Sequence, residues 1–136
     1  MKILLDTNVL ISAFVFAGKT GALLSELIGS DHRLYVSEYV DREFKEKLEM
    51  KWPDKAERIY ALFHKMSFHF CESTDKKLGQ LRDCKDIPVL SDAMYHGVDI
   101  ILTGDKDFLE AGLENPLIYS PTMMFDYLHG DNCKKL

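Results

Sequence analysis

Short apolar runs recur along this chain, and segments with helical periodicity separate them. The runs at residues 3–5 and 100–102 contain only leucine and isoleucine and end at or near an aspartate. Continuous apolar runs of this length are typical of strands buried on both faces, as in a parallel sheet with helices packed on each side. The alternation therefore predicts an α/β fold with a central, mostly parallel sheet. The expected strands are residues 2–5 (KILL), 33–36 (RLYV), 67–70 (SFHF), 99–102 (DIIL) and 117–119 (LIY).

Helices are expected between these strands, and several have recognisable start and stop signals. Ser37 is well placed to cap a helix that runs to about residue 50, and Gly29 closes an earlier helix. Pro53, Pro88 and Pro121 each stand where a helix is expected to begin, because proline is favoured in the first helical turn. The expected helices are residues 9–16, 20–28, 38–50, 53–66, 88–97, 105–112 and 121–128.

The composition is that of one soluble domain, expected to span residues 1–136. Hydrophobic residues make up 46% of the chain and charged residues 29%, and the net charge of -5 argues against a generic basic nucleic-acid binder. It does not exclude a nucleic-acid enzyme, because bound cations change the local sign. Three cysteines without C-x-x-C spacing, and no signal peptide, favour a reducing cytoplasm. The longest apolar run, residues 9–17, is too short to cross a bilayer, so no membrane association is expected.

Aspartates stand where the expected strands end or the expected helices begin. Asp6 directly follows the first strand, Asp105 follows the fourth, and Asp86 precedes Pro88. Gly104 is expected to let the chain turn tightly before Asp105. Ligands in α/β folds gather at the carboxyl ends of the strands, so these acids could share one site. Taken singly, each is better explained as a helix cap, because aspartate is a preferred N-cap and suits the helix dipole.

A glutamate changes that balance. In the helix expected after Ser37, Glu43 falls inside the apolar arc formed by Val40, Phe44 and Leu48, at about 100° per residue. A carboxylate that points toward a core is costly unless it is paired or bound to a metal. The alternative is an ion pair with Lys47, four residues further along the same helix.

The same angular argument makes two further predictions. It places Met50 on the apolar side of the helix that carries Glu43. It places Asp92 about 200° from Leu90 in the helix that begins near Pro88, so Asp92 is expected to be solvated and outside the site.

Carboxylates that converge on one sheet edge would repel one another strongly unless cations neutralise them. Hard oxygen ligands suit Mg²⁺ or Mn²⁺, which usually keep waters and accept phosphate oxygens as further ligands. One such ion would lower the pKa of a bound water, and a second could stabilise a leaving oxygen. The pattern therefore favours metal-assisted hydrolysis of phosphodiester bonds.

Four segments of the chain, in this order, combine into a specific pattern although each alone is weak. They are LLDTNVLIS at 4–12, VSEYVDREFKEKL at 36–48, RDCKDIPVLSDAMYHGVDIILTGDKDFL at 82–109 and IYSPTMMFDYL at 118–128. The combination resembles the PIN-domain family of metal-dependent ribonucleases. Its last two segments are most similar to the toxin components of type II toxin–antitoxin systems, which are VapC-like.

This resemblance implies a three-layer α/β/α sandwich around a central parallel sheet of five strands, and cleavage of RNA as the activity. It implies one or two Mg²⁺ or Mn²⁺ ions as cofactors, a small antitoxin as protein partner and a homodimer. The family's acidic, metal-binding site falls on Asp6, Glu43, Asp86 and Asp105.

The resemblance also implies supporting residues. Asn8 and Thr103 match polar positions that brace the first and last aspartates, and Asp107 and Asp83 match auxiliary acids. The family commonly has proline after its equivalent of Asp83, whereas this chain has Cys84, which weakens the case for Asp83.

Other functions are disfavoured by particular residues. AFVFAGKT at residues 13–20 is one residue away from a P-loop, but Ala13 replaces the first glycine and the bulky interior would block phosphate. LLDTNVL resembles the opening of haloacid-dehalogenase phosphatases, but Asn8 stands where a catalytic aspartate is needed. A non-catalytic PIN-like module that binds RNA or protein is the remaining alternative, and the intact set of acids argues against it.

Overall fold

The computed structural model describes residues 1–78 and 86–130. Its strands form one sheet of five parallel strands in the order β3-β2-β1-β4-β5. The prediction of a central, mostly parallel sheet is confirmed, and all five strands proved to be parallel. The strands are β1 Lys2–Leu5, β2 Arg33–Ser37, β3 His69–Cys71, β4 Ile100–Leu102 and β5 Leu117–Tyr119.

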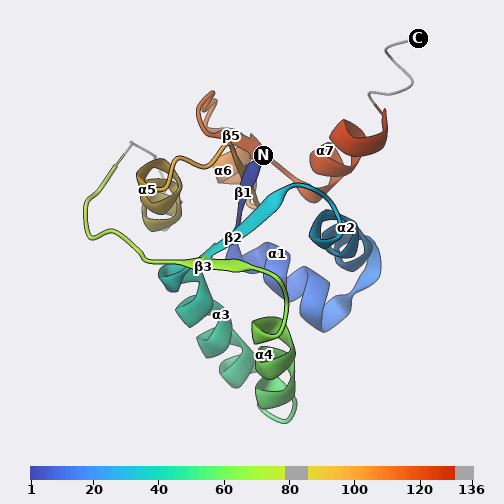
Figure 1. The fold of residues 1–136 in the computed structure, drawn as a ribbon. Helices are drawn as coiled ribbons and strands as arrows, with labels where there is room; N and C mark the ends of the chain where they lie inside the picture. The colour runs from blue at the N-terminus through green and yellow to red at the C-terminus, as the bar shows by residue number, and fades with distance from the viewer. Residues whose placement is uncertain (79–85, 131–136) are drawn as a thin grey trace.

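Helices cover both faces of this sheet, which confirms the three-layer α/β/α architecture. Figure 1 shows α5 and α6 on one side of the strands and α1 to α4 on the other. This arrangement follows from right-handed crossovers, because the chain moves outward from β1 to β3 and then returns past β1 to β4. The helices are α1 Thr7–Ile11, α2 Gly18–Ile28, α3 Glu38–Lys51, α4 Ala56–His64, α5 Ile87–Tyr95, α6 Lys106–Leu109 and α7 Pro121–Phe125, with π-helical segments η1 Ser12–Phe16 and η3 Asp126–Gly130.

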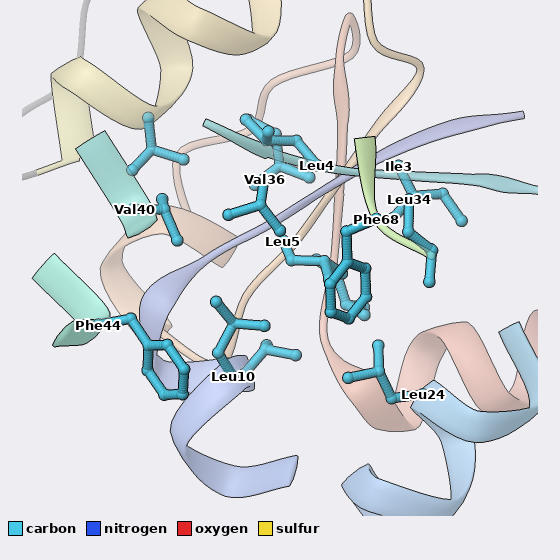
Figure 2. Packing of buried hydrophobic residues seen from close by; sticks show 14 of the residues in the cluster. Ile3, Leu4, Leu5, Leu10, Leu24, Leu34, Val36, Val40, Phe44 and Phe68 are labelled. Atoms are coloured by element: carbon cyan, nitrogen blue, oxygen red, sulfur yellow. The ribbon is translucent and has the colours of Figure 1, made fainter. Parts of the chain in front are cut away.

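Part of the core lies between the sheet and the helices of the α1–α4 face, and α5 and α6 bury further side chains against the opposite face. Figure 2 shows Leu5 of β1 near Leu10 of α1, with Val40 and Phe44 of α3 beside them. These side chains are fully buried. Phe44 packs edge-on against Phe63 of α4, with their ring centroids 4.9 Å apart. The short apolar runs are therefore buried for the reason expected, which is that helices cover both faces of the sheet.

Several helix boundaries differ from the expectations; α6, for example, ends at Leu109 rather than at residue 112. The first helix begins at Thr7, directly after Asp6, and widens into the π-helical segment η1 before the chain turns at Ala17, whose φ is 60°. Pro53 begins a turn rather than a helix, and α4 starts three residues later at Ala56. The phosphate-loop resemblance at residues 13–20 has no strand before it, which agrees with its rejection.

Two predictions of solvent exposure were wrong. Met50 is 77% exposed, because Trp52 at the end of α3 packs against Phe16 and takes the apolar position instead. Asp92 is 1% exposed, because the segment that follows β3 covers this side of α5.

Helix α5 ends in a Schellman motif. Gly97 follows the C-cap His96 with φ +63°, a left-handed conformation that costs a residue with a Cβ about 1 kcal/mol or more. Its N–H donates to the carbonyl of Met94, and the N–H of Val98 donates to the carbonyl of Ala93. The turn delivers the chain directly into β4.

No single helix in the described ranges is long and apolar enough to cross a membrane. The segments Thr7–Phe16 and Gly18–Ile28 reach that length and composition only together, and they are bent by 106° relative to each other.

Candidate active site

Asp6 lies at the carboxyl end of the central strand β1 and is 6% exposed. Its Oδ1 accepts a hydrogen bond from the N–H of Thr7 at 2.8 Å, so Asp6 is also the N-cap of α1. Its Oδ2 accepts from the hydroxyl of Thr103 at 2.7 Å and from the amide of Asn8 at 3.3 Å. The carboxylate is therefore held in one orientation by Thr7 and Asn8 of α1 and by Thr103, which directly follows the neighbouring strand β4.

Asn8 and Thr103 link the ends of these two strands through hydrogen bonds. Leu5 pairs with Leu102 in the sheet, so the residues that follow each strand lie side by side. The side-chain oxygen of Asn8, Oδ1, accepts a hydrogen bond from the N–H of Gly104 at 2.8 Å. Its side-chain nitrogen, Nδ2, donates to the Thr103 hydroxyl oxygen at 3.3 Å. That oxygen also accepts from the N–H of Asp105 at 3.1 Å, so Thr103 uses its one donor and two acceptor positions.

Asp105 is the N-cap of α6, and its Oδ1 accepts from the N–H of Asp107 at 2.9 Å. Asp107 lies in the first turn and is exposed. Gly104 does not have a positive φ, so the turn does not need a glycine for its backbone conformation. The contribution of Gly104 is its N–H, which donates to Asn8.

Glu43 is half-buried on α3, on the side that faces α1. Its Oε1 accepts a hydrogen bond from the Thr7 hydroxyl at 2.5 Å. The alternative expectation for Glu43 was an ion pair with Lys47. In the described ranges the ion pairs are His64 with Asp41 and His129 with Glu26, and neither involves Glu43.

Asp86 stands directly before α5 and is 6% exposed. Unlike Asp6 and Asp105, it does not use its side chain to cap its helix. Asp83, the weaker auxiliary candidate, lies outside the described residues.

The pKa of Tyr39 is affected by acids that come from different elements. Burial raises the pKa of Tyr39, and the charges of Glu43, Asp6 and Asp86 raise it further, while Arg42 acts in the opposite direction. Three carboxylates from β1, α3 and the start of α5 therefore lie close enough to act on one side chain. Asp105 joins the same set because its charge, like that of Glu43, acts on Asp6.

The buried carboxyl of Asp6 has a raised pKa. Burial is the largest cause, and the charges of Glu43 and Asp105 add to it, while the hydrogen bonds from Thr103 and Thr7 oppose it. The environment therefore makes ionisation of Asp6 less favourable than it is in water. A cation beside it would reverse that preference.

The acids suit a divalent cation in chemical type, since they offer only hard oxygen ligands. Within residues 1–78 and 86–130, however, no three His, Cys, Asp or Glu side chains are arranged to hold a metal ion as they stand. Hydroxyl donors from Thr7 and Thr103 satisfy carboxylate oxygens that an ion would otherwise take.

Sequence reasoning missed two members of this site, Thr7 and Tyr39. Thr7 directly follows Asp6, begins α1 and is 1% exposed. Its burial beside a candidate ligand cannot be read from the sequence, which predicts a later start for this helix. Tyr39 lies in the first turn of α3, and an aromatic residue there gives no indication in the sequence that carboxylates lie near its hydroxyl group.

The PIN-domain family model matches residues 2–107, which include Asp6, Glu43, Asp86 and Asp105. This chain belongs to the PIN-domain family. Solved structures agree with the fold of this PIN domain. A chain in the crystal structure of VapBC2 from Rickettsia felis, bound to a DNA fragment from their promoter, has a TM-score of 0.70 and 17% identity, over 88% of this chain and 98% of that one.

A chain in the structure of FitAB bound to an IR36 DNA fragment has a TM-score of 0.63 and 20% identity to this PIN domain, over 88% of this chain and 94% of that one. At these identities the likeness concerns the fold. No curated protein sequence gave a significant match to this PIN domain.

Proposed function

We propose that this PIN domain is a divalent-cation-dependent endoribonuclease. The observation that supports the proposal is a set of hydrogen bonds at the carboxyl ends of β1 and β4: Thr7 contacts both Asp6 and Glu43, and Thr103 contacts both Asp6 and the backbone of Asp105. Asp86 is included because its charge, like those of Asp6 and Glu43, raises the pKa of Tyr39. Negatively charged carboxylates that lie close together and are partly buried repel one another, and a bound cation would offset this cost in free energy.

Asp6, Glu43, Asp86 and Asp105 would hold one or two Mg²⁺ or Mn²⁺ ions. When bound, such an ion supplies Lewis acidity toward a phosphodiester oxygen and toward an attacking water. The remaining chemistry belongs to the chain itself. Thr103 and Asn8 hold the Asp6 carboxylate in one orientation, and the backbone N–H of Asp107 fixes one oxygen of Asp105.

RNA is the substrate that we favour, although the chain has a net charge of -5. The cation would offset the repulsion between the acidic edge and the phosphate backbone. Arg42 is the charged group that opposes the carboxylates at Tyr39, and it is a candidate contact for a substrate phosphate.

We further propose that this nuclease is the toxin of a toxin–antitoxin pair and acts as a homodimer. VapBC2 and FitAB, the complexes to which its fold is similar, are each bound to DNA. Co-expression with the product of the neighbouring reading frame, followed by size-exclusion chromatography with light scattering, tests both points. A monomer that binds no such product would contradict them.

The nuclease proposal is tested with purified protein and a mixed pool of structured and single-stranded RNA, in EDTA, Mg²⁺ or Mn²⁺. We expect cleavage only with a divalent cation, and a loss of at least about 100-fold in Asp6→Asn, Glu43→Gln and Asp105→Asn. Glu46→Gln is the matched control for Glu43→Gln, because Glu46 lies on the same helix and is exposed.

Glu46→Gln is expected to cleave like the wild type. Wild-type protein that cleaves no RNA in any cation would refute the proposed activity. A fully active Asp6→Asn variant would refute the site while leaving the activity in place.

A further inference from the structure

Asp92 is a buried carboxylate that the proposed chemistry does not use. It lies on α5 and is 1% exposed. Its Oδ2 accepts a hydrogen bond from the Ser73 hydroxyl at 2.7 Å, and its Oδ1 accepts from the N–H of Thr74 at 2.8 Å. A charged side chain in the interior is costly unless its oxygens are satisfied, and here the segment after β3 supplies both donors.

Ser73 passes this contact on to α3. Its hydroxyl oxygen accepts from the backbone N–H of Tyr39 at 2.9 Å, while its own N–H donates to the Glu38 carboxylate at 2.9 Å. The first N–H groups of a helix have no partner within the helix, so Ser73 acts as an external cap on α3. Ser37, the N-cap residue of α3, caps the same turn, because its side chain accepts a hydrogen bond from the N–H of Val40.

The two helices joined in this way position different members of the acidic site. Tyr39 and Glu43 lie one turn apart on α3, and Asp86 stands at the start of α5, six residues before Asp92. Helices α3 and α5 contact each other. In Figure 1 the segment after β3 runs from the edge strand toward α5.

We propose that Asp92 is a positioning residue for the acidic site. The line of contacts from Asp92 through Ser73 to the Tyr39 N–H sets the first turn of α3 against α5, and so sets the spacing between Glu43 and Asp86. The proposal rests on the proposed function only in calling that spacing catalytic. The contacts themselves are independent of it.

Ser91 offers a matched control for this line of contacts. It precedes Asp92 on α5, is also 1% exposed, and its hydroxyl bonds the N–H of Leu78 at 2.9 Å and its carbonyl at 3.1 Å. Ser91 therefore anchors the same segment to the same helix, but these two hydrogen bonds do not reach α3. Ser91→Ala and Ser73→Ala should lower the melting temperature to a similar extent.

The variants should differ at the site. We expect Asp92→Asn and Ser73→Ala to weaken Mn²⁺ binding in calorimetry and to lower kcat for RNA, each by about tenfold, with little change in KM. Ser73→Thr keeps the hydroxyl and should restore both values, whereas Ser91→Ala should leave both at the wild-type level. Equal Mn²⁺ affinity and kcat in Ser73→Ala and Ser91→Ala would overturn the proposal.

A measurement without metal or RNA separates this proposal from the nuclease proposal. Hydrogen exchange of the Tyr39 amide, followed by NMR, should accelerate in Asp92→Asn and Ser73→Ala but not in Ser91→Ala. If the wild type neither binds Mn²⁺ nor cleaves RNA, the nuclease proposal fails and the exchange rates still decide whether Asp92 holds α3. An unchanged Tyr39 amide in Asp92→Asn would overturn the positioning role.

Discussion

Asp6 and Asp105 each serve as a helix cap and also as a member of the acid set. The two roles had been alternatives in the sequence, yet a carboxylate has two oxygens and about four lone pairs, so one oxygen can cap while the other faces the site. Asp6 caps α1 through Oδ1 and meets Thr103 through Oδ2. A capping signal at a strand end is therefore no evidence against a ligand.

The charge of Asp105 should be measurable through Asp6 in the metal-free protein. Asp105→Asn keeps the cap of α6, since asparagine caps as well as aspartate, but removes one of the charges that raise the pKa of Asp6. The pKa of Asp6 should fall, although burial still keeps it above the ordinary value for an aspartate. An NMR titration of the Asp6 carboxyl carbon measures this, with Asp107→Asn as the exposed control.

The same substitution should change how stability depends on pH. Because the folded pKa of Asp6 is raised, the associated stability is fully present below pH 3.8 and is lost as pH rises through the folded pKa. Asp105→Asn should therefore be more stable than the wild type at neutral pH, by on the order of 1 kcal/mol, and the difference should shrink in acid. A melting temperature of Asp105→Asn below that of the wild type at neutral pH would contradict this explanation.

At the scale of elements, the sequence predicted those features that depend on neighbouring residues along the chain. All five strands, the Ser37 cap and the acids at strand ends follow from short apolar runs and capping preferences. What it could not predict depends on which segment covers which. Asp92 has a polar angular position on α5 and is buried only because the chain after β3 crosses it. The surroundings of the Tyr39 hydroxyl likewise depend on Asp6 and Asp86, which belong to other elements.

The Schellman motif after α5 gives a prediction at this scale. Gly97→Ala should destabilise the protein by about 1 kcal/mol, because alanine is strained at φ +63°. Gly29→Ala is the matched control: Gly29 also ends a helix, but its φ is -82° and a Cβ there would make only ordinary contacts. Urea unfolding measures both. Equal losses in the two variants would mean that the left-handed conformation is not the cause.

At the scale of the whole molecule, β1 is the centre of the fold in two senses. It is the middle strand of the sheet, and it ends in Asp6. The strand order was not predictable from the apolar runs, because every run reads as a buried strand. It required the pairing of β1 with β4, which joins segments about a hundred residues apart.

Truncation of a leucine in the middle and at the edge of the sheet should show this asymmetry. Leu4 of β1 is 0% exposed and Leu117 of β5 is 40% exposed. Leu4→Ala should cost about 2–5 kcal/mol in chemical denaturation, whereas Leu117→Ala should cost less than about 1 kcal/mol. A small loss at Leu4 would mean that the core around β1 can collapse to fill the space.

The hydrogen bonds that join Asn8 to Gly104 and Thr103 to Asp6 also order events during synthesis. Their partners are 96 and 97 residues apart, so a chain still growing on the ribosome carries Asp6 long before it carries the residues that orient it. A chain that stops before residue 105 lacks Asp105 altogether. The acidic edge can therefore be completed only after Thr103, Gly104 and Asp105 have been synthesised.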